Sequence, residues 1–286
     1  MWHLIAKTIA ATAVGVMLLV AVAAAAVPTV RNIASGWWNN PEGLAALPDN
    51  PQVHYESGAS EQARTVAGLL PAAIARVEAV HGRRFAHPVT VGVYVTPEAF
   101  VAANGLGNRS AVGMTFLGRV MLSPVLFSVQ RQRLPAILTH ELSHAHLRGW
   151  ISQLSVMHLP QWFKEGLAVM VSRGGGAEGV SELQARDAIR RGDHIAIESS
   201  SSLFNLAAVK FAQPPETPNT SFLTEMAYRQ AGLFVAFLHE TDPVGFARMM
   251  NAILDGRPFA EAVAAEYETD LKTLWLRFVE AALTPR

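Results

Sequence analysis

Two histidines, His140 and His144, lie four positions apart in a stretch of helix-forming residues, and Glu141 directly follows the first of them. Residues four apart lie on the same face of a helix, so both imidazoles can reach one cation. Glu141 occupies the next position, from which its carboxylate can contact a water beside that cation without binding the cation itself. This spacing is typical of hydrolases in which two histidines hold zinc and a glutamate takes a proton from water.

Glu165 is the best candidate for a third ligand, because a catalytic zinc normally has three protein ligands. It follows His144 by 21 positions and lies in a second expected helix, which begins at Pro160 and ends before the three glycines at 174–176. It lies between Trp162-Phe163 and the apolar residues 167–169, and an unpaired carboxylate in such a setting would be unfavourable. The sequence therefore predicts one Zn²⁺ per chain held by His140, His144 and Glu165, a ligand set that also suits Mn²⁺ or Co²⁺.

The stretch WFKEGLA at 162–168, taken with the first motif, resembles the gluzincin metallopeptidases, specifically the peptidase MA-like group. In that group two helices that carry H-E-x-x-H and W-x-x-E-G-x-A hold one zinc. The resemblance covers about residues 53–280 and is specific only at the two zinc motifs. It implies a zincin-like fold and hydrolysis of peptide bonds. Some gluzincins have a carboxylate four residues after the third ligand, where this chain has Val169, so Asp187, Glu225 or a backbone carbonyl is expected to orient the zinc-binding histidines.

Tyr228 is the second candidate for a catalytic residue, after Glu141. The pair Ala227-Tyr228, leading into the apolar stretch 233–238, resembles a tyrosine-bearing helix of the same family. A tyrosine hydroxyl near zinc can donate to the oxyanion that forms when water attacks an amide. The alternative is that Tyr228 packs in the core of an amphipathic helix.

Two further histidines lie close to the motif in the sequence. His146 follows His144 by two positions and therefore points to another face of the helix. His158 lies in the expected reversal between the two motif helices. Both are expected to stay outside the site.

The composition limits the function classes further. The chain has 286 residues, no formal net charge, 50% hydrophobic residues and no cysteine. A balanced charge excludes the broad basic face of a general nucleic-acid binder, so no nucleic-acid partner is expected. The lack of cysteine excludes disulfide scaffolds, thiol catalysis and cysteine-based metal sites.

The N-terminal region contains 19 consecutive uncharged residues at 9–27. At about 1.5 Å per residue they reach about 28 Å as a helix, enough to cross a bilayer core. The length favours a signal anchor, whereas the alanines at 24–26 allow a cleaved signal peptide, and residues 1–27 are assigned to one or the other. Either interpretation places the rest of the chain on the non-cytoplasmic side of a cell membrane. Trp37 and Trp38 follow, and they either sit at the membrane interface or pack on the domain.

The elements that must position the candidate site follow an α+β order, with strands before helices. Residues 28–51 are expected to be a linker, 52–173 a zincin-like N-terminal subdomain with both ligand helices, and 174–286 a helical C-terminal subdomain. The first part is expected to contain strands at 52–56 and 89–95, a hairpin at 112–122, and helices at 61–80 (with Ser60 as N-cap) and from 97. The ligand helices are expected at 134–147 and 160–172, and later helices at 181–191, 224–240, 244–254, 258–266 and 270–283. The connection 199–219, rich in serine and proline, is expected to be a mobile flap over the cleft.

These observations predict a zinc-dependent peptidase, anchored in or exported across the membrane, that acts on a protein or peptide substrate. The alternative is a catalytically idle zincin-like module for binding or assembly, for which loss of Glu141 would be the usual sign. A hydrolase of other bonds is the third possibility, although the sequence contains no glycine-rich phosphate loop.

Overall fold

The structure is a computed structural model that describes residues 5, 12, 15–16, 27–198, 211–212 and 220–283. Almost all of the expected anchor and most of the connection expected to be a flap lie outside these residues. Among the helices in the described ranges, none is both long enough and apolar enough to cross a bilayer.

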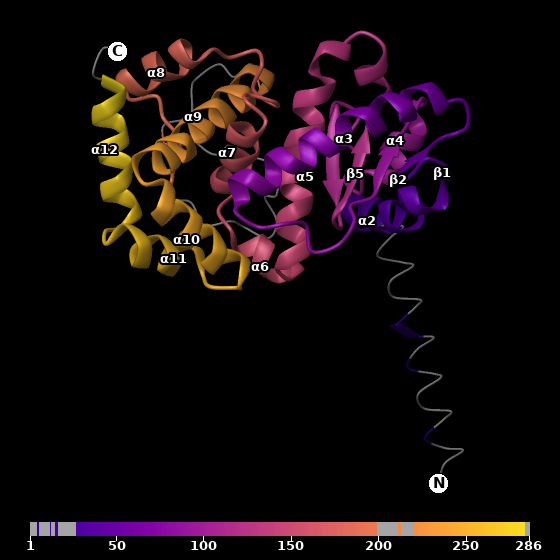
Figure 1. The fold of residues 1–286 in the computed structure, drawn as a ribbon, viewed down its shortest axis with the longest axis horizontal. Coiled ribbons are helices and arrows are strands. Elements are labelled where there is room, and N and C mark those ends of the chain that lie inside the picture. The colour runs from indigo at the N-terminus through magenta and orange to yellow at the C-terminus, as the bar shows by residue number, and fades with distance from the viewer. Residues whose placement is uncertain are drawn as a thin grey trace.

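A five-stranded mixed sheet occupies one side of the molecule (Figure 1). Its strand order is β1-β2-β3-β5-β4, with parallel pairing of β2 with β3 and of β3 with β5, and antiparallel pairing of the two outer pairs. The hairpin of β4 and β5 turns at Leu117 and Gly118, which both have positive φ, as the twist of a two-residue hairpin requires. The strands are β1 (Ala45–Leu47), β2 (Asn50–Tyr55), β3 (Val91–Val93), β4 (Gly113–Phe116) and β5 (Arg119–Leu122).

Helices cover both faces of the sheet. Alternate residues of β5 point to opposite faces, so Val120 and Leu122 join the main core while Met121 joins a smaller cluster with Phe100 of α4. The main core lies between the sheet, α3 and α5 and continues among the helices that follow α5. The helices of this part are α2 (Pro28–Trp38), α3 (Ser60–His81) and α4 (Pro97–Ala103), and α5 (Leu134–Trp150) lies between the sheet and the remaining helices (Figure 1).

After α5, the described chain contains helices, the loops between them and one isolated β-bridge between Ile195 and Phe211. Three short 3₁₀ turns occur earlier, at Pro41–Gly43, Pro124–Phe127 and Arg131–Arg133. The helices after α5 are α6 (Gln153–His158), α7 (Gln161–Val171), α8 (Glu182–Arg190), α9 (Thr220–Thr241), α10 (Pro243–Leu254), α11 (Phe259–Tyr267) and α12 (Leu271–Leu283). The α+β class predicted from the order of the elements is therefore confirmed.

Glycines let α7 and α9 pack closely. A Cβ on Gly166 of α7 would lie 2.5 Å from the carbonyl oxygen of Ala231, and a Cβ on Gly232 of α9 would lie 2.6 Å from Cγ1 of Val169. Real Cβ atoms do not approach so closely, so both positions require glycine. This packing brings the N-terminal half of α9, which carries Tyr228, against the helix that carries Glu165.

Three expectations differ from the structure. Residues 28–51 are not the linker that the sequence predicts, because they contain α2, a 3₁₀ turn and β1. Hydrogen bonds from Asn32 and Ser35 to backbone carbonyls fix α2 to the domain. Trp37 and Trp38 are 63% and 79% exposed, so the interpretation that both pack on the domain is wrong. Ser60 is the first residue of α3 and not its N-cap, which is Ala59 without a side-chain hydrogen bond.

Candidate metal centre

The structure brings His140, His144 and Glu165 together in one cluster. Nε2 of His140 lies 3.2 Å from Nε2 of His144. Oε2 of Glu165 lies 3.3 Å from the first of these nitrogens and 3.5 Å from the second. The histidines lie on successive turns of α5, and α7 returns alongside α5 with Glu165 facing both rings.

These three atoms fit a small cation of tetrahedral preference. Ligand atoms about 2.0–2.1 Å from a tetrahedral zinc lie about 3.3 Å apart, which is close to all three separations in the cluster. Two imidazole nitrogens and one carboxylate oxygen are also a known donor set for catalytic zinc. The group can therefore hold a metal ion, whose identity the geometry does not select.

The site is buried, and it is more open beside His144 than beside His140 or Glu165. His140 and Glu165 are 4% and 6% exposed, whereas the side chain of His144 is 17% exposed. Burial disfavours a charged carboxylate, but the imidazoles of His144 and His140 hold the pKa of Glu165 well below its usual range. Burial likewise disfavours a charged His140, yet Glu165 and Glu141 raise the pKa of that ring above its ordinary value. The carboxylate of Glu165 and the ring of His140 thus stabilise each other's charged forms.

A backbone carbonyl orients His140. Its Nδ1 donates to the carbonyl oxygen of Gly175 at 2.8 Å, which leaves Nε2 free to face the other ligands. The glycine loop makes this approach possible, because a Cβ on Gly175 would lie 2.7 Å from the carbonyl oxygen of Ala136. Gly176 has φ +84°, and a Cβ there would lie 3.0 Å from Cε1 of His140.

The carboxylates considered for this orienting role lie elsewhere. Asp187 pairs with Arg190 at 2.7 Å, and Glu225 accepts a hydrogen bond from the backbone N–H of Gly179. Val169, four residues after Glu165, packs against Gly232. The backbone carbonyl that the sequence left open is thus the partner of His140.

Glu141 faces β4 and does not join the three ligand atoms. Oγ1 of Thr115 lies 2.8 Å from Oε2 of Glu141 and 2.8 Å from its backbone carbonyl oxygen, so the hydroxyl can donate to either acceptor. The strand approaches closely because residue 113 is glycine, where a Cβ would lie 2.6 Å from Cγ2 of Ile137 and 2.9 Å from Cγ of Glu141. The carboxylate is buried beside the metal ligands with one side-chain partner, as a positioned proton acceptor would be.

Tyr228 lies at the cluster. Its ring stacks on His140 with a centroid distance of 6.3 Å and an interplanar angle of 19°. Burial and the nearby carboxylates of Glu165 and Glu141 hold the pKa of Tyr228 well above its usual range, so its hydroxyl stays protonated as a donor. The residue is therefore beside the candidate metal ligands and is not a remote part of the core.

The other two histidines near the motif point away. His146 lies on the opposite side of α5 in a buried network with His81 and Ser143, and His158 bonds to the carbonyl oxygen of Leu154. Both placements agree with the expectation that these residues stay outside the cluster.

Sequence reasoning missed three groups that contact the candidate site residues: Thr115 at Glu141, Gln161 at Glu165, and the carbonyl of Gly175 at His140. Nε2 of Gln161 donates to Oε1 of Glu165 at 2.6 Å, so only Oε2 faces the histidines. The spacing of Gln161 and Glu165, one helical turn apart, could have indicated this contact. Thr115 and Gly175 carry no such local signal, because their contacts depend on how strand and loop pack on α5.

Comparisons of this chain with protein-family models, with curated proteins and with solved structures found no match.

Proposed function

We propose that this chain is a zinc-dependent peptidase of zincin-like fold. The observation that supports the proposal most strongly is the convergence of His140, His144 and Glu165 within ligand distance of one point, with Glu141 buried beside them. The motif residues that resemble the gluzincins are the same residues that converge. In this proposal the apolar run at 9–27 tethers the chain to the membrane or directs its export, and the metal centre lies on the non-cytoplasmic side.

A bound divalent metal would supply Lewis-acid activation of water and of a substrate carbonyl. Glu141 accepts a proton from the attacking water at its carboxylate and passes that proton to the leaving amine. Thr115 holds the carboxylate of Glu141 in place through its hydroxyl. The hydroxyl of Tyr228 donates to the oxygen that becomes negative as the amide is attacked.

The position of β4 suggests how a peptide would bind. This strand lies at the edge of the sheet, beyond β5, and packs beside α5. An edge strand offers backbone N–H and C=O groups to an extended peptide. Gly113 keeps the strand close to Glu141, so a peptide paired along β4 would pass the proposed base.

The alternative function is an idle zincin-like module for binding or assembly. Such a module would have no need to keep a carboxylate buried beside the metal ligands and bonded to Thr115. The presence of that arrangement favours the peptidase.

The experiment compares the wild-type chain with Glu141→Gln and His144→Ala, measuring bound metal and hydrolysis of a quenched peptide library with added zinc. Glu141→Gln is expected to retain metal, because Glu141 is not a ligand, and to lose about 10²–10⁴-fold in turnover. His144→Ala is expected to lose metal and activity together. Full activity in a metal-loaded Glu141→Gln chain would overturn the mechanism, and a wild-type chain that binds zinc but cleaves no peptide would favour the idle module.

A further inference from the structure

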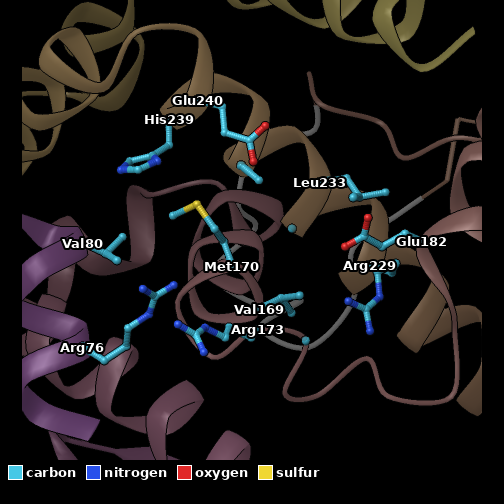
Figure 2. Close-up of a pocket in the computed structure, with 13 residues that line it drawn as sticks. Arg76, Val80, Val169, Met170, Arg173, Glu182, Arg229, Leu233, His239 and Glu240 are labelled. Carbon is cyan, nitrogen blue, oxygen red and sulfur yellow. The ribbon is translucent and has the colours of Figure 1, made fainter. Parts of the chain in front are cut away.

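A pocket separate from the metal ligands lies between α3, the end of α7 and α9 (Figure 2). Its volume is about 340 Å³, within the range of pockets that hold small ligands. Part of its lining is apolar and the rest is charged. The apolar part includes Val80, Val169, Met170 and Leu233, and none of the proposed metal ligands or catalytic residues lines it.

Three arginines from three different elements line this pocket, which we call the arginine pocket. Arg76 comes from α3, Arg173 lies two residues after the end of α7, and Arg229 comes from α9. In Figure 2 the side chains of Arg76 and Arg173 lie next to each other on one wall, with Met170 above them. Segments that are distant in the sequence thus place three positive charges around one small volume.

Backbone carbonyls hold two of these side chains in place. Nε of Arg76 donates to the carbonyl oxygen of Val171 at 3.1 Å. Arg229 donates to the carbonyl oxygens of Val180 and Ala177, at 2.8 and 2.7 Å. A carbonyl fixes a guanidinium without neutralising its charge, so both side chains are positioned while still positive.

The three guanidiniums form no ion pair within the part of the chain that the structure describes. Glu182 and Glu240 also line the pocket. Like charges around a small pocket repel each other, and a bound anion would remove that repulsion.

We propose that the arginine pocket binds a small ligand through an oxyanion group, a phosphate or a carboxylate, whose apolar part contacts Met170 and Leu233. Guanidinium groups bind both oxyanions through paired N–H donors. The three arginines, two held in place and one exposed, provide N–H donors for the anion. The apolar side chains of the pocket contact the rest of the ligand. The glutamates at the same pocket would select against ligands with further negative charges.

The arginine pocket shares a loop with the candidate metal centre. Arg173 and Gly174 line the pocket, and the next residue, Gly175, accepts the hydrogen bond from His140. Arg229 also packs against Gly174, where a Cβ would lie 2.9 Å from its guanidinium nitrogens. A ligand on Arg173 would therefore restrain the loop that orients His140. This consequence rests on the proposed metal centre, whereas the binding of an anion to the arginine pocket does not depend on it.

The test titrates inorganic phosphate, and separately acetate, into the metal-free full-length chain at fixed ionic strength, in non-ionic detergent, with calorimetric detection. Saturable binding of one phosphate per chain is expected. Arg173→Gln should weaken it about tenfold or more, because an ionic hydrogen bond is lost. This variant should fold, since Arg173 is exposed and no hydrogen bond of its side chain is found in the described chain. Binding of acetate as well would assign the site to carboxylates and phosphates alike, and binding of phosphate alone would restrict it to phosphates.

Two further variants make the test specific. Glu182→Gln removes a negative charge from the pocket and should tighten phosphate binding. Arg64→Gln removes an exposed arginine from the same helix as Arg76, three turns away from it, and should leave binding unchanged. Absence of saturable binding of either anion, or equal binding by wild type and Arg173→Gln, would overturn the proposal without bearing on the metal centre.

Discussion

Gln161 donates a 2.6 Å hydrogen bond to Oε1 of Glu165, one turn further along α7, and leaves Oε2 facing His140 and His144. The amide thus fixes the rotation of the carboxylate and decides which oxygen is available to a metal. Groups that orient metal ligands in this way typically change metal affinity 10–100-fold when they are removed.

Gln161→Met should therefore weaken zinc binding by about tenfold, because the side chain keeps its length but loses the donor. Competition with a chromophoric chelator measures the affinity. Glu165→Ala should lose more, since it removes the ligand itself, and Gln132→Met, at an exposed glutamine before α5, should change nothing. If Gln161→Met binds zinc as tightly as wild type, the amide does not position the carboxylate.

The close contact between α7 and α9 can be tested by replacing Gly166 with alanine and comparing the result with the same change at an exposed glycine elsewhere. Gly166→Ala should destabilise the chain by about 1–3 kcal/mol, because its Cβ would lie 2.5 Å from a backbone oxygen of α9. Gly68→Ala should stabilise it by about 0.5–1 kcal/mol, since that position is exposed in α3 with no atom within 4 Å of a Cβ. Chemical denaturation of both variants measures the two changes, and equal stabilities would contradict the close packing.

The buried network behind α5 predicts a pH dependence of stability. Nε2 of His146 faces the carbonyl oxygens of Arg83 and Arg84, so it carries a hydrogen and Nδ1 accepts one from His81. Nε2 of His81 then accepts from the hydroxyl of Ser143, and every ring is neutral. Burial, followed by the charges that His146 and His144 would carry, holds the pKa of His81 well below its ordinary value.

Because the folded pKa of His81 is lowered, its contribution to stability is fully present above the unfolded pKa of about 6.5 and is lost as the pH falls below it. From pH 6 downward the free energy of unfolding should decrease by up to about 1.4 kcal/mol per pH unit through this group. His81→Asn, which takes up no proton, should show a shallower slope in urea denaturation, whereas the exposed control His87→Asn should keep the wild-type slope. Identical slopes in wild type and His81→Asn would show that the ring titrates normally.

The uncharged run at 9–27 predicts how the chain fractionates. A spanning helix is held by hydrocarbon burial and not by charge, so a retained anchor keeps the full-length chain in the membrane pellet after an alkaline wash. Cleavage after Ala26 would instead release a chain that begins at Val27. Recovery of the intact chain from the cytosol would contradict both interpretations.

The two exposed tryptophans of α2 predict a contact between this helix and the lipid bilayer. Tryptophan prefers the membrane–water interface, and Trp37 and Trp38 follow the uncharged run on a helix that the domain holds in place. In vesicles with brominated lipids, the full-length chain should lose part of its tryptophan fluorescence. Changing both tryptophans to Phe should reduce that quenching, whereas Trp150→Phe should not. Unchanged quenching in the double variant would place the pair away from the lipid.

The sequence by itself determined the local features. The four-residue spacing of His140 and His144 requires one helix face, and Pro135 and the glycines at 174–176 mark where the two ligand helices begin and end. The hairpin predicted at 112–122 followed from the Leu-Gly turn at 117–118, and the structure pairs residues 113–116 with 119–122. These features depend on residues close together in the chain, so periodicity and turn chemistry are sufficient to predict them.

Tertiary structure decided everything that joins distant segments. Whether Glu165 reaches the histidines depends on how α7 packs on α5, and whether Tyr228 reaches His140 depends on Gly166 and Gly232 letting α9 approach α7. The sequence offered Asp187 and Glu225 as partners for the histidines, but a carbonyl of the glycine loop fills that role, and every residue has a carbonyl. Local patterns cannot distinguish such a group, because only the packed backbone determines which carbonyl points at the ring.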